Sequence, residues 1–270
     1  MKKLLLLSTI LILYSCGNND YISPYDFSEN HSDTGSNNEK ITIFPTSLNS
    51  YWIYESYEVN QNNEIINETR ELDSIVVSGE TKKFGKKGYI FSYYKNNGSS
   101  YQKIRDDFYF LQKDQVWTYE TWLNQLIAEN LPFNLIPLSD TSFIKILDIN
   151  DDLWRIYRVN LDNANNPGLP FGKISGKADI LCSWEGKTTI KTNLGNIQSD
   201  EYLTTISINL TLDIPFIGKQ NIIIEREYTR YYANNIGLIK SKLTPTSISL
   251  PIIGDVNING FEKTLIYYSK

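Results

Sequence analysis

Short segments that alternate aromatic or β-branched residues with polar ones recur from residue 51 to the end of the chain. Gly, Pro, Asn and Asp, the residues that favour turns, separate these segments. Alternation with a period of two is typical of strands that bury one face. The segments are 52–59, 89–94, 101–111, 143–147, 153–159, 178–185, 202–213, 221–232, 237–243 and 256–268. Many short strands at regular spacing predict a mainly β fold, with an antiparallel sheet that forms a half-closed barrel or a sandwich.

Two details of this arrangement can be predicted. Asn150-Asp151-Asp152 lies between the segments 143–147 and 153–159, so we expect these two strands to form a hairpin. Residues 119–129 carry a helical pattern instead, because apolar residues such as Trp122 recur there at four-residue spacing. The sequence therefore predicts one short helix among the strands.

The N-terminus has the layout of a secretory signal. Met1-Lys2-Lys3 is followed by an apolar run over 4–14 and then by Ser15-Cys16. A membrane-spanning helix needs roughly 20 residues, so this shorter run predicts a cleaved signal peptide over 1–15. The stretch 16–40 is polar and has no sustained apolar period, which predicts a flexible, disordered tether.

The segment Leu13-Tyr14-Ser15-Cys16 resembles the bacterial lipobox, although Tyr14 stands where a small residue is usual. The resemblance implies that Cys16 carries the lipid and that the protein is held at a membrane by several acyl chains. Several chains give stable attachment, whereas one chain gives only reversible binding. Gly17, rather than Asp, follows Cys16, and on that basis we expect an outer-membrane location in the cell envelope.

Two further segments resemble a group of uncharacterised cell-envelope lipoproteins of Bacteroidota and their relatives. Phe44-Pro45 with the downstream Asn49–Tyr54 looks like that group's Phe-Pro…Trp-x-Tyr first strand. The segment Tyr231–Lys240 looks like its Tyr-Tyr-Ala-x-x-Ile-Gly-Leu-x-Lys segment. The resemblance implies a β-rich envelope domain and brings no assigned activity with it.

Length and charge limit the organisation and the partners. The stretch 41–270 is long enough for a single β-rich domain, in which we expect Asn163–Gly168 to be a long loop. The chain has a formal net charge of −5, which disfavours nucleic acid as a partner. Only Cys16 and Cys182 are cysteines, so an acylated Cys16 leaves no internal disulfide.

The residue types disfavour catalysis and metal binding. His31 is the only histidine and lies in the tether, so a nucleophile in the folded part would lack its usual base. Cys182 shares an apolar strand face with Trp184 and is predicted to be a buried hydrophobe. The oxygen-rich segments Asp148–Asp152 and Asp162–Asn166 lack EF-hand spacing and are typical of turns. We therefore expect no catalytic residue, no metal and no cofactor.

Pairs of carboxylates are the remaining residues that could catalyse a reaction without histidine. The neighbours Asp106-Asp107 should point to opposite faces of their strand. Glu225 and Glu227 share a face, whereas Arg226 and Arg230 point the other way. A glycosidase needs two carboxyls about 5–10 Å apart, one of them with its pKa raised by burial. Solvated strand faces are the favoured interpretation of these residues.

Apolar loops that contain proline recur between the predicted strands. Surface loops are normally polar, so apolar tips need a reason. At one end of the sheet they would form the mouth of an apolar cavity, a rim that touches a membrane, or a docking patch. Alternatively, they fold inwards and plug the barrel with the helix as a lid. The candidate contact residues are Phe171, Phe216, Ile217, Ile252 and Ile253 in the loops and Trp122 in the helix.

The sequence predicts a non-enzymatic envelope lipoprotein that binds an apolar ligand or a protein partner through these loops. One alternative is a carbohydrate-binding or carbohydrate-active surface lipoprotein, because 19 Tyr and 5 Trp could stack on sugars. A second alternative is a structural or adhesive envelope protein. A closed cavity would favour the ligand carrier, exposed coplanar aromatic rings the sugar binder, and a flat surface patch the structural role.

Overall fold

The computed structural model describes most of the chain from residue 43 to its end. Within that range, residues 97, 128–135, 166–172, 217 and 251–253 are not described. The predictions for the signal peptide (1–15), for Cys16 and for the tether (16–40) therefore lie outside the described residues. No helix among the described residues is both long enough and apolar enough to span a membrane.

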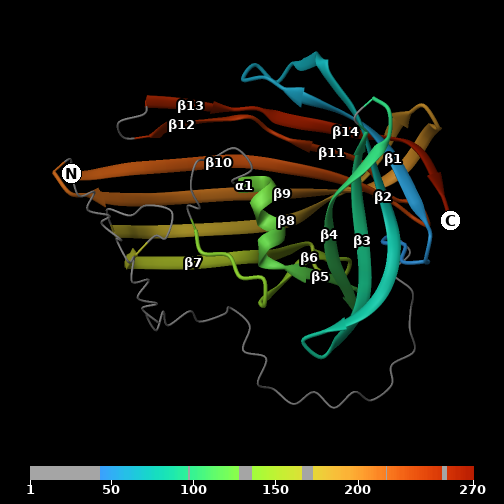
Figure 1. Cartoon of the computed structure of the whole chain (residues 1–270), viewed down its shortest axis with the longest axis horizontal. Helices are drawn as coiled ribbons and strands as arrows, with labels where there is room; N and C mark the ends of the chain where they lie inside the picture. The colour runs from blue at the N-terminus through green and yellow to red at the C-terminus, as the bar shows by residue number, and fades with distance from the viewer. Residues whose placement is uncertain (1–42, 97, 128–135, 166–172, 217, 251–253) are drawn as a thin grey trace, which may run out of the picture. The chain divides into compact units, whose positions relative to one another are not determined.

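Fourteen strands make up most of the described chain. They are β1 (Tyr51–Val59), β2 (Ile65–Lys83), β3 (Lys86–Asn96), β4 (Tyr101–Gln112), β5 (Gln115–Tyr119), β6 (Phe143–Asp148), β7 (Leu153–Asn165), β8 (Lys173–Thr192), β9 (Gly195–Ile214), β10 (Gly218–Ala233), β11 (Gly237–Leu243), β12 (Thr246–Leu250), β13 (Gly254–Ile258) and β14 (Gly260–Ser269). Twelve of them form one antiparallel sheet in the order β6-β5-β4-β3-β2-β1-β14-β11-β10-β9-β8-β7. The remaining two, β12 and β13, pair with each other. In Figure 1, β2, β3 and β4 cross the direction of β7–β10, as expected of a strongly twisted sheet.

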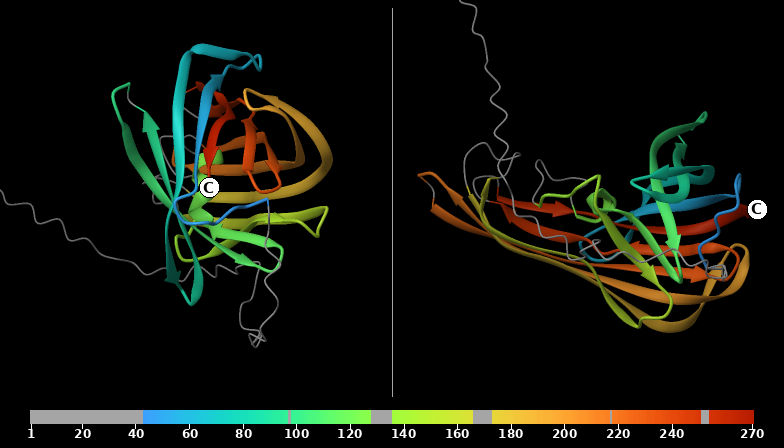
Figure 2. Two further views of the ribbon diagram at one scale, coloured as in Figure 1. Left: turned by 90° about the vertical axis from the view of Figure 1, so that its right-hand side faces the viewer. Right: turned by 90° about the horizontal axis from the view of Figure 1, so that it is seen from below.

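The sheet curls until its two edge strands, β6 and β7, lie next to each other (Figure 2). The indole nitrogen of Trp154 in β7 donates a hydrogen bond of 3.1 Å to the backbone oxygen of Lys145 in β6. No ladder joins these two edges among the described strands. The predicted half-closed antiparallel barrel with one short helix is confirmed.

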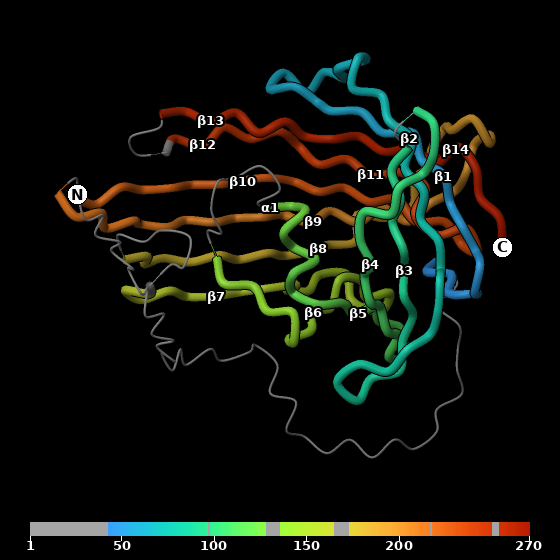
Figure 3. The backbone as a smooth tube through the Cα atoms, viewed as in Figure 1, coloured from blue at the N-terminus to red at the C-terminus, as the bar shows by residue number. Residues whose placement is uncertain are grey.

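The long strands β8, β9 and β10 run side by side along one wall of the barrel (Figure 3). Their residues alternate between core and solvent, as the sequence pattern predicted. In β10, Ile222 and Ile224 are fully buried, whereas Glu225 and Glu227 are exposed. The solvated interpretation of these two glutamates is confirmed.

The predicted helix is present as a 3-10 turn, η1 (Glu120–Leu123), followed by α1 (Asn124–Ile127). Its apolar stripe is buried, because Leu123 and Leu126 have almost no exposed surface. The stripe faces the inner side of β10, where the ring of Trp122 lies 6.3 Å from that of Tyr228. The helical segment therefore crosses the interior of the barrel.

The predicted hairpin between 143–147 and 153–159 is wrong. Strand β6 pairs with β5 and strand β7 pairs with β8, so the two segments end at opposite edges of the sheet. The sequence pattern does not predict a strand at β5 (Gln115–Tyr119), and β5 takes the place beside β6. The connection after β6 is held instead by the hydrogen bond of 3.1 Å from Ile149 N to Asp114 O.

The predicted apolar face of β8 holds for Cys182 but fails at Trp184. Ile180 and Cys182 are fully buried, whereas Trp184 is 37% exposed. The register between β8 and β9 shifts directly after Trp184. Its indole nitrogen donates to Asp200 Oδ1 at 3.2 Å, which holds the ring at the surface.

Candidate functional site

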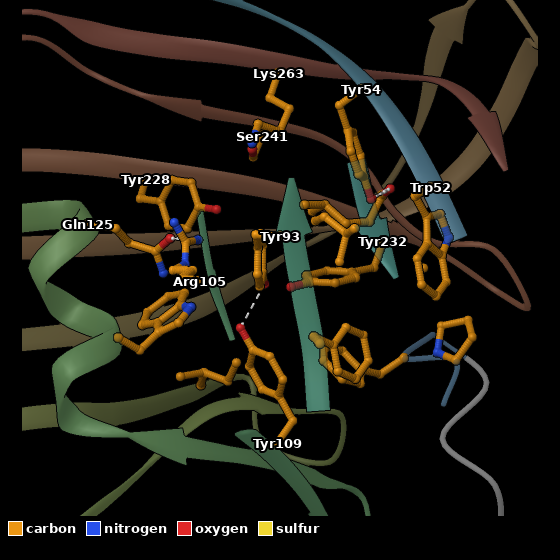
Figure 4. A pocket seen from close by; sticks show the side chains of 18 of the residues that line it. Trp52, Tyr54, Tyr93, Arg105, Tyr109, Gln125, Tyr228, Tyr232, Ser241 and Lys263 are labelled. Carbon is orange, nitrogen blue, oxygen red and sulfur yellow. Dashed lines mark hydrogen bonds between the residues drawn. The ribbon is translucent and has the colours of Figure 1, made fainter. Parts of the chain in front are cut away.

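The interior of the barrel contains a cavity of about 100 Å³, which we call the barrel cavity (Figure 4). Its walls are mainly aromatic and come from both halves of the sheet. The aromatic residues include Trp52, Tyr54, Phe91, Tyr93, Tyr109, Tyr228 and Tyr232. A few polar side chains, Arg105, Gln125, Ser241 and Lys263, reach the same space. Aromatic walls with few convergent polar groups are the usual composition of a small-molecule site.

Strand register places Arg105 against an aromatic ring. Tyr93 in β3 pairs with Arg105 in β4 across the sheet. The guanidinium carbon of Arg105 lies 4.1 Å from the centre of the Tyr93 ring, within the range of a cation–π contact. On its other side, Arg105 Nη2 donates to Gln125 Oε1 of α1 at 2.8 Å. The cation is thus held between a strand and the helix.

Asp107 is the carboxylate partner of Arg105. Arg105 Nε lies 3.3 Å from Asp107 Oδ2, and Tyr109 Oη donates to the same oxygen at 3.2 Å. Burial raises the pKa of Asp107 and outweighs the opposing effect of Arg105. Asp106 points to the other face, as predicted, where Lys103 Nζ lies 2.7 Å from its Oδ2. The expectation of solvated carboxylates is therefore wrong for Asp107, because its strand turns this side chain inwards.

The phenols around the cavity are neutral hydrogen-bonding groups. Tyr93 Oη and Tyr109 Oη lie 3.0 Å apart, and Tyr54 Oη donates to Leu238 O at 2.9 Å (Figure 4). Burial raises the pKa of Tyr54, Tyr93 and Tyr109, and it raises the pKa of Tyr228 to about 12. These phenols therefore supply no negative charge to the interior at neutral pH.

A second ion pair borders the cavity on the β14 side. Lys263 Nζ lies 2.6 Å from Asp73 Oδ2 of β2. Ser56 Oγ donates to the same carboxylate oxygen at 3.2 Å. Lys263 is therefore neutralised by a partner of its own, as Arg105 is.

Arg230 of β10 lies directly behind the cavity wall. It is 1% exposed, and its guanidinium carbon lies 5.4 to 5.9 Å from the ring centres of Tyr228, Trp122 and Tyr232. Nη2 donates to Ile146 O at 2.9 Å and lies within hydrogen-bonding distance of two weaker acceptors. Nε and Nη1 have no hydrogen-bond partner in the part of the chain that the structure describes. The same three rings line the barrel cavity, so they lie between the guanidinium group of Arg230 and the cavity.

Cys182 is one of the weaker acceptors of Arg230. Its Sγ lies 3.4 Å from Arg230 Nη2, and the residue is free of any disulfide and fully buried. The prediction of a buried, small hydrophobe is confirmed. The other weak acceptor is Thr204 Oγ1, at 3.2 Å.

Arg226, which lies two inward-facing positions before Arg230 on β10, is also buried, but all its nitrogen positions are hydrogen-bonded. Its Nε donates to Thr244 O at 2.9 Å, and Nη1 and Nη2 donate to Leu126 O and Asn259 O at 3.0 Å each. These three backbone oxygens belong to the helix and to the segments that flank the β12–β13 hairpin. Arg226 therefore joins three elements of the fold.

The structure places two of the six predicted contact residues. Trp122 lines the barrel cavity. Phe216 lies in the β9–β10 hairpin with its side chain fully exposed and is not among the residues that line that cavity. Phe171, Ile217, Ile252 and Ile253 lie outside the described residues. Phe216, the one candidate loop residue that the structure describes, therefore does not share a site with Trp122.

Trp122 also lines a second, more polar cleft of about 380 Å³, which we call the rim cleft. Asp107, Tyr119 and Lys83 line the rim cleft as well. The partner of Asp107, Arg105, lines the barrel cavity. Trp122 thus lines both spaces, whereas Arg105 and Asp107 each line one of them.

Among the residues that the structure describes, neither a metal site nor a flat platform of aromatic rings for a sugar stands out. Within the described ranges, no group of three or more His, Cys, Asp or Glu side chains could hold a metal ion. At the acidic end of β6, Asp148 forms an ion pair instead of a metal site, since its Oδ2 lies 2.6 Å from Lys145 Nζ. Trp52, Trp117 and Trp154 are buried. The exposed Tyr267 lies 5.6 Å from the Tyr51 ring at an angle of 30°, so the two rings are not coplanar.

Comparisons with known proteins yield only distant likenesses. No protein-family model matches the sequence, and no curated protein matches it significantly. A provisionally assigned lipoprotein of Parabacteroides distasonis is 14% identical over 84% of this chain and 98% of its own, with a TM-score of 0.43. A provisionally assigned exported protein of Bacteroides fragilis with a YmcC-like fold is 10% identical over the same shares, with a TM-score of 0.44.

The hypothetical lipoprotein YmcC of Escherichia coli is 8% identical over 85% of this chain and 88% of its own, with a TM-score of 0.24. All three TM-scores lie below 0.5, so none of these likenesses carries an argument about the function of this chain. The functional argument therefore rests on the residues of the chain itself.

Proposed function

We propose that this chain is a lipid-anchored protein of the cell envelope that binds a small organic ligand in the barrel cavity. The observation that carries the proposal is the composition of that cavity, where aromatic walls surround a few convergent polar side chains. Two of these polar groups, Arg105 and Gln125, come from different elements and bond to each other at 2.8 Å. Their positions are fixed before a ligand arrives, which lowers the ordering cost of binding.

The size of the cavity limits the ligand. Sites for drug-sized molecules enclose roughly 300–1,000 Å³, and an apolar cavity of about 150 Å³ accepts benzene. A cavity of about 100 Å³ therefore accepts a group of benzene size or smaller. The apolar ligand predicted from the sequence becomes a small molecule, or the small head of a larger one, rather than a whole lipid.

The anchor is supported by the sequence. The Leu13–Cys16 segment resembles a lipobox and follows a short apolar run with a basic start. The protein would be held by acyl chains on Cys16, in the outer membrane, with its barrel in the aqueous space beside it. A Cys16→Ser variant should move from the membrane fraction to the soluble fraction and lose the acyl mass. If the variant stays in the membrane fraction and wild-type Cys16 carries no acyl mass, the proposal of a lipid anchor on Cys16 is wrong.

The protein would act by binding and not by catalysis. Its one histidine, His31, precedes the barrel in the sequence, and the buried thiol of Cys182 contacts Arg230 rather than a base. Nucleophilic catalysis depends on a base positioned beside the nucleophile. The charged side chains that line the cavity, Arg105 and Lys263, are instead suited to holding a ligand.

The binding proposal can be tested with a variant that fills the cavity. Ser241 lines the cavity and is 1% exposed, and its hydroxyl makes no hydrogen bond of normal geometry with the described residues. A Ser241→Leu side chain should occupy part of the space and remove a polar atom that lacks a partner. We expect compounds that raise the unfolding temperature of the full wild-type chain to lose that effect in this variant.

A matched control is Ser199→Leu, since Ser199 is 3% exposed and does not line the barrel cavity. Compounds that stabilise this control and the wild type alike, but not Ser241→Leu, act at the cavity. If a broad set of small molecules stabilises none of the three proteins, or stabilises all three equally, the barrel cavity is not a binding site.

A further inference from the structure

The barrel cavity and the layer behind its wall carry an unbalanced charge. The cations are Arg105 and Lys263 in the wall and Arg230 behind it, and the carboxylates are Asp107 and Asp73. Asp107 forms an ion pair with Arg105, and Asp73 forms one with Lys263. Arg230 has no carboxylate within ion-pair distance in the part of the chain that the structure describes, so one positive charge remains in excess.

A buried, unpaired cation is costly, because burial removes its water and nothing replaces the lost solvation in full. Three aromatic rings around Arg230 offset part of this cost through cation–π contacts. They cannot satisfy the N–H groups of Nε and Nη1, which make no hydrogen bond of normal geometry with the described residues. The site is therefore incomplete in the protein alone.

The atoms that lack partners are concentrated at the cavity. Four buried side-chain polar atoms have no hydrogen-bond partner among the described residues, and three of them belong to Arg230 and Ser241. Ser241 lines the cavity, and four residues that Arg230 contacts also line it, namely Trp122, Ile146, Tyr228 and Tyr232. The polar atoms without hydrogen bonds and the positive charge without a counter-ion thus lie at the barrel cavity or directly behind its wall.

Resting on the proposed function, we propose that the ligand of the barrel cavity is a small organic carboxylate, which Arg105 contacts and which Arg230 neutralises from behind the Trp122–Tyr228–Tyr232 wall. Arginine suits a carboxylate because its planar N–H groups match the two oxygens. The aromatic walls would enclose the apolar part of the acid. A cavity of about 100 Å³ fits a short-chain acid of the size of butyrate.

Asp107 competes with such a ligand for Arg105, since its Oδ2 lies 3.3 Å from Arg105 Nε. Asp107→Asn keeps the shape of the side chain and removes its charge. This variant should bind a carboxylate about three- to tenfold more tightly than the wild type, because Arg105 is then free of its internal counter-ion. Its affinity for a neutral ligand should not change.

The test compares butyrate with butyramide, which has the same shape and no charge, by calorimetric titration of the full chain in lipid nanodiscs. We expect butyrate to bind at least tenfold more tightly than butyramide. In Arg230→Met the preference should fall to about twofold or less, whereas Arg230→Lys, which retains the charge, should keep most of it. Arg226→Lys is the matched control on the same strand face and should keep the full preference.

Circular dichroism and an unfolding curve for each variant show that it is folded. If butyrate and butyramide bind the wild type equally, or if Arg230→Met keeps the full preference, the anion inference is wrong while a cavity ligand stands. If neither probe binds and the small-molecule set of the cavity-filling test also fails, the proposed function is wrong and the inference fails with it.

Discussion

Arg226 and Arg230 lie four residues apart on β10 and share its inner face, yet they are bonded very differently. All three nitrogen positions of Arg226 donate to backbone oxygens at 2.9 to 3.0 Å. Arg230 uses only Nη2, and its Nε and Nη1 are left without partners among the described residues. Both residues are buried, with exposures of 5% and 1%.

The difference separates a structural role from a binding role. A buried polar group that is fully hydrogen-bonded rigidifies its surroundings, whereas one that is partly bonded is a cost to the fold. Arg226 connects β10 to the helix and to the β12–β13 segment and so stabilises the barrel. Arg230 contributes less to the barrel than it costs, which is reasonable if the negative charge of a ligand in the cavity offsets its positive charge.

The largest expected effect compares methionine variants of these two arginines. Arg226→Met leaves three buried or half-buried backbone oxygens without their donor and should lower the free energy of unfolding by ~3 kcal/mol. Arg230→Met loses fewer bonds and removes an unpaired buried charge, so its stability should stay within ~1 kcal/mol of the wild type. Urea unfolding of both variants, without added ligand, measures the difference.

Equal losses in the two variants would contradict this comparison. Arg230 would then be a structural residue like Arg226, and its charge would need no ligand. Arg226→Lys and Arg230→Lys serve as controls, because they keep the charge and change only the hydrogen-bonding geometry.

A smaller effect is expected from a bound acid. At a butyrate concentration ten times its dissociation constant, the wild type should gain about 1.4 kcal/mol of stability by mass action. Arg230→Met should gain much less at the same concentration, because the charge that favours the acid is missing. Unfolding temperatures recorded over a butyrate series give this result, with butyramide as the neutral control.

The smallest expected effect concerns Asp179, which binds two arginines and a lysine on the outer surface. Arg155 Nε lies 2.9 Å from Asp179 Oδ1, and Arg158 and Lys177 hold the other oxygen. Burial alone would raise the pKa of Asp179, but the hydrogen bonds from Arg158, Lys177 and Arg155 outweigh it and lower the pKa to about 2. Because the three cations are partly exposed, Asp179→Asn should cost only ~1 kcal/mol at pH 7.

The sign of the pH dependence follows from the lowered pKa. The folded protein holds the Asp179 proton less tightly than the unfolded chain does, so this contribution is complete above the usual pKa of 3.8 and is lost as the pH falls towards about 2. The stability difference between wild type and Asp179→Asn should shrink over that interval. A difference that stays constant from pH 7 to pH 2 would show that the cluster does not act through this carboxylate.

Much of the fold could be predicted from the strand pattern, and the exceptions have physical causes. Strand β2 was missed because its first half is largely exposed and polar, so no alternation is visible there. The predicted strand 256–268 is two strands, β13 and β14. They meet at Gly260, where a Cβ would lie 2.0 Å from Leu243 O, so only glycine allows this close approach.

The site was harder to predict than the fold. Alternation on β10 put Arg226 and Arg230 on the same side as Ile222 and Ile224, which was a signal that they are buried. It could not show which of the two would be fully bonded, because the partners of Arg226 come from residues 126, 244 and 259. The sequence pattern around Asp107 likewise shows only that it faces away from Asp106, whereas its burial depends on the closure of the barrel.

The most direct test of the central claim, that the barrel cavity holds a small acid through the charge of Arg230, is the mass of what the protein carries. The full chain is purified from its own bacterium, and small molecules released on denaturation are identified by mass spectrometry. The account predicts one small organic acid per chain in the wild type and in Arg226→Lys, and its loss from a folded Arg230→Met. A neutral compound in the cavity, or an acid that Arg230→Met retains at full occupancy, would contradict it.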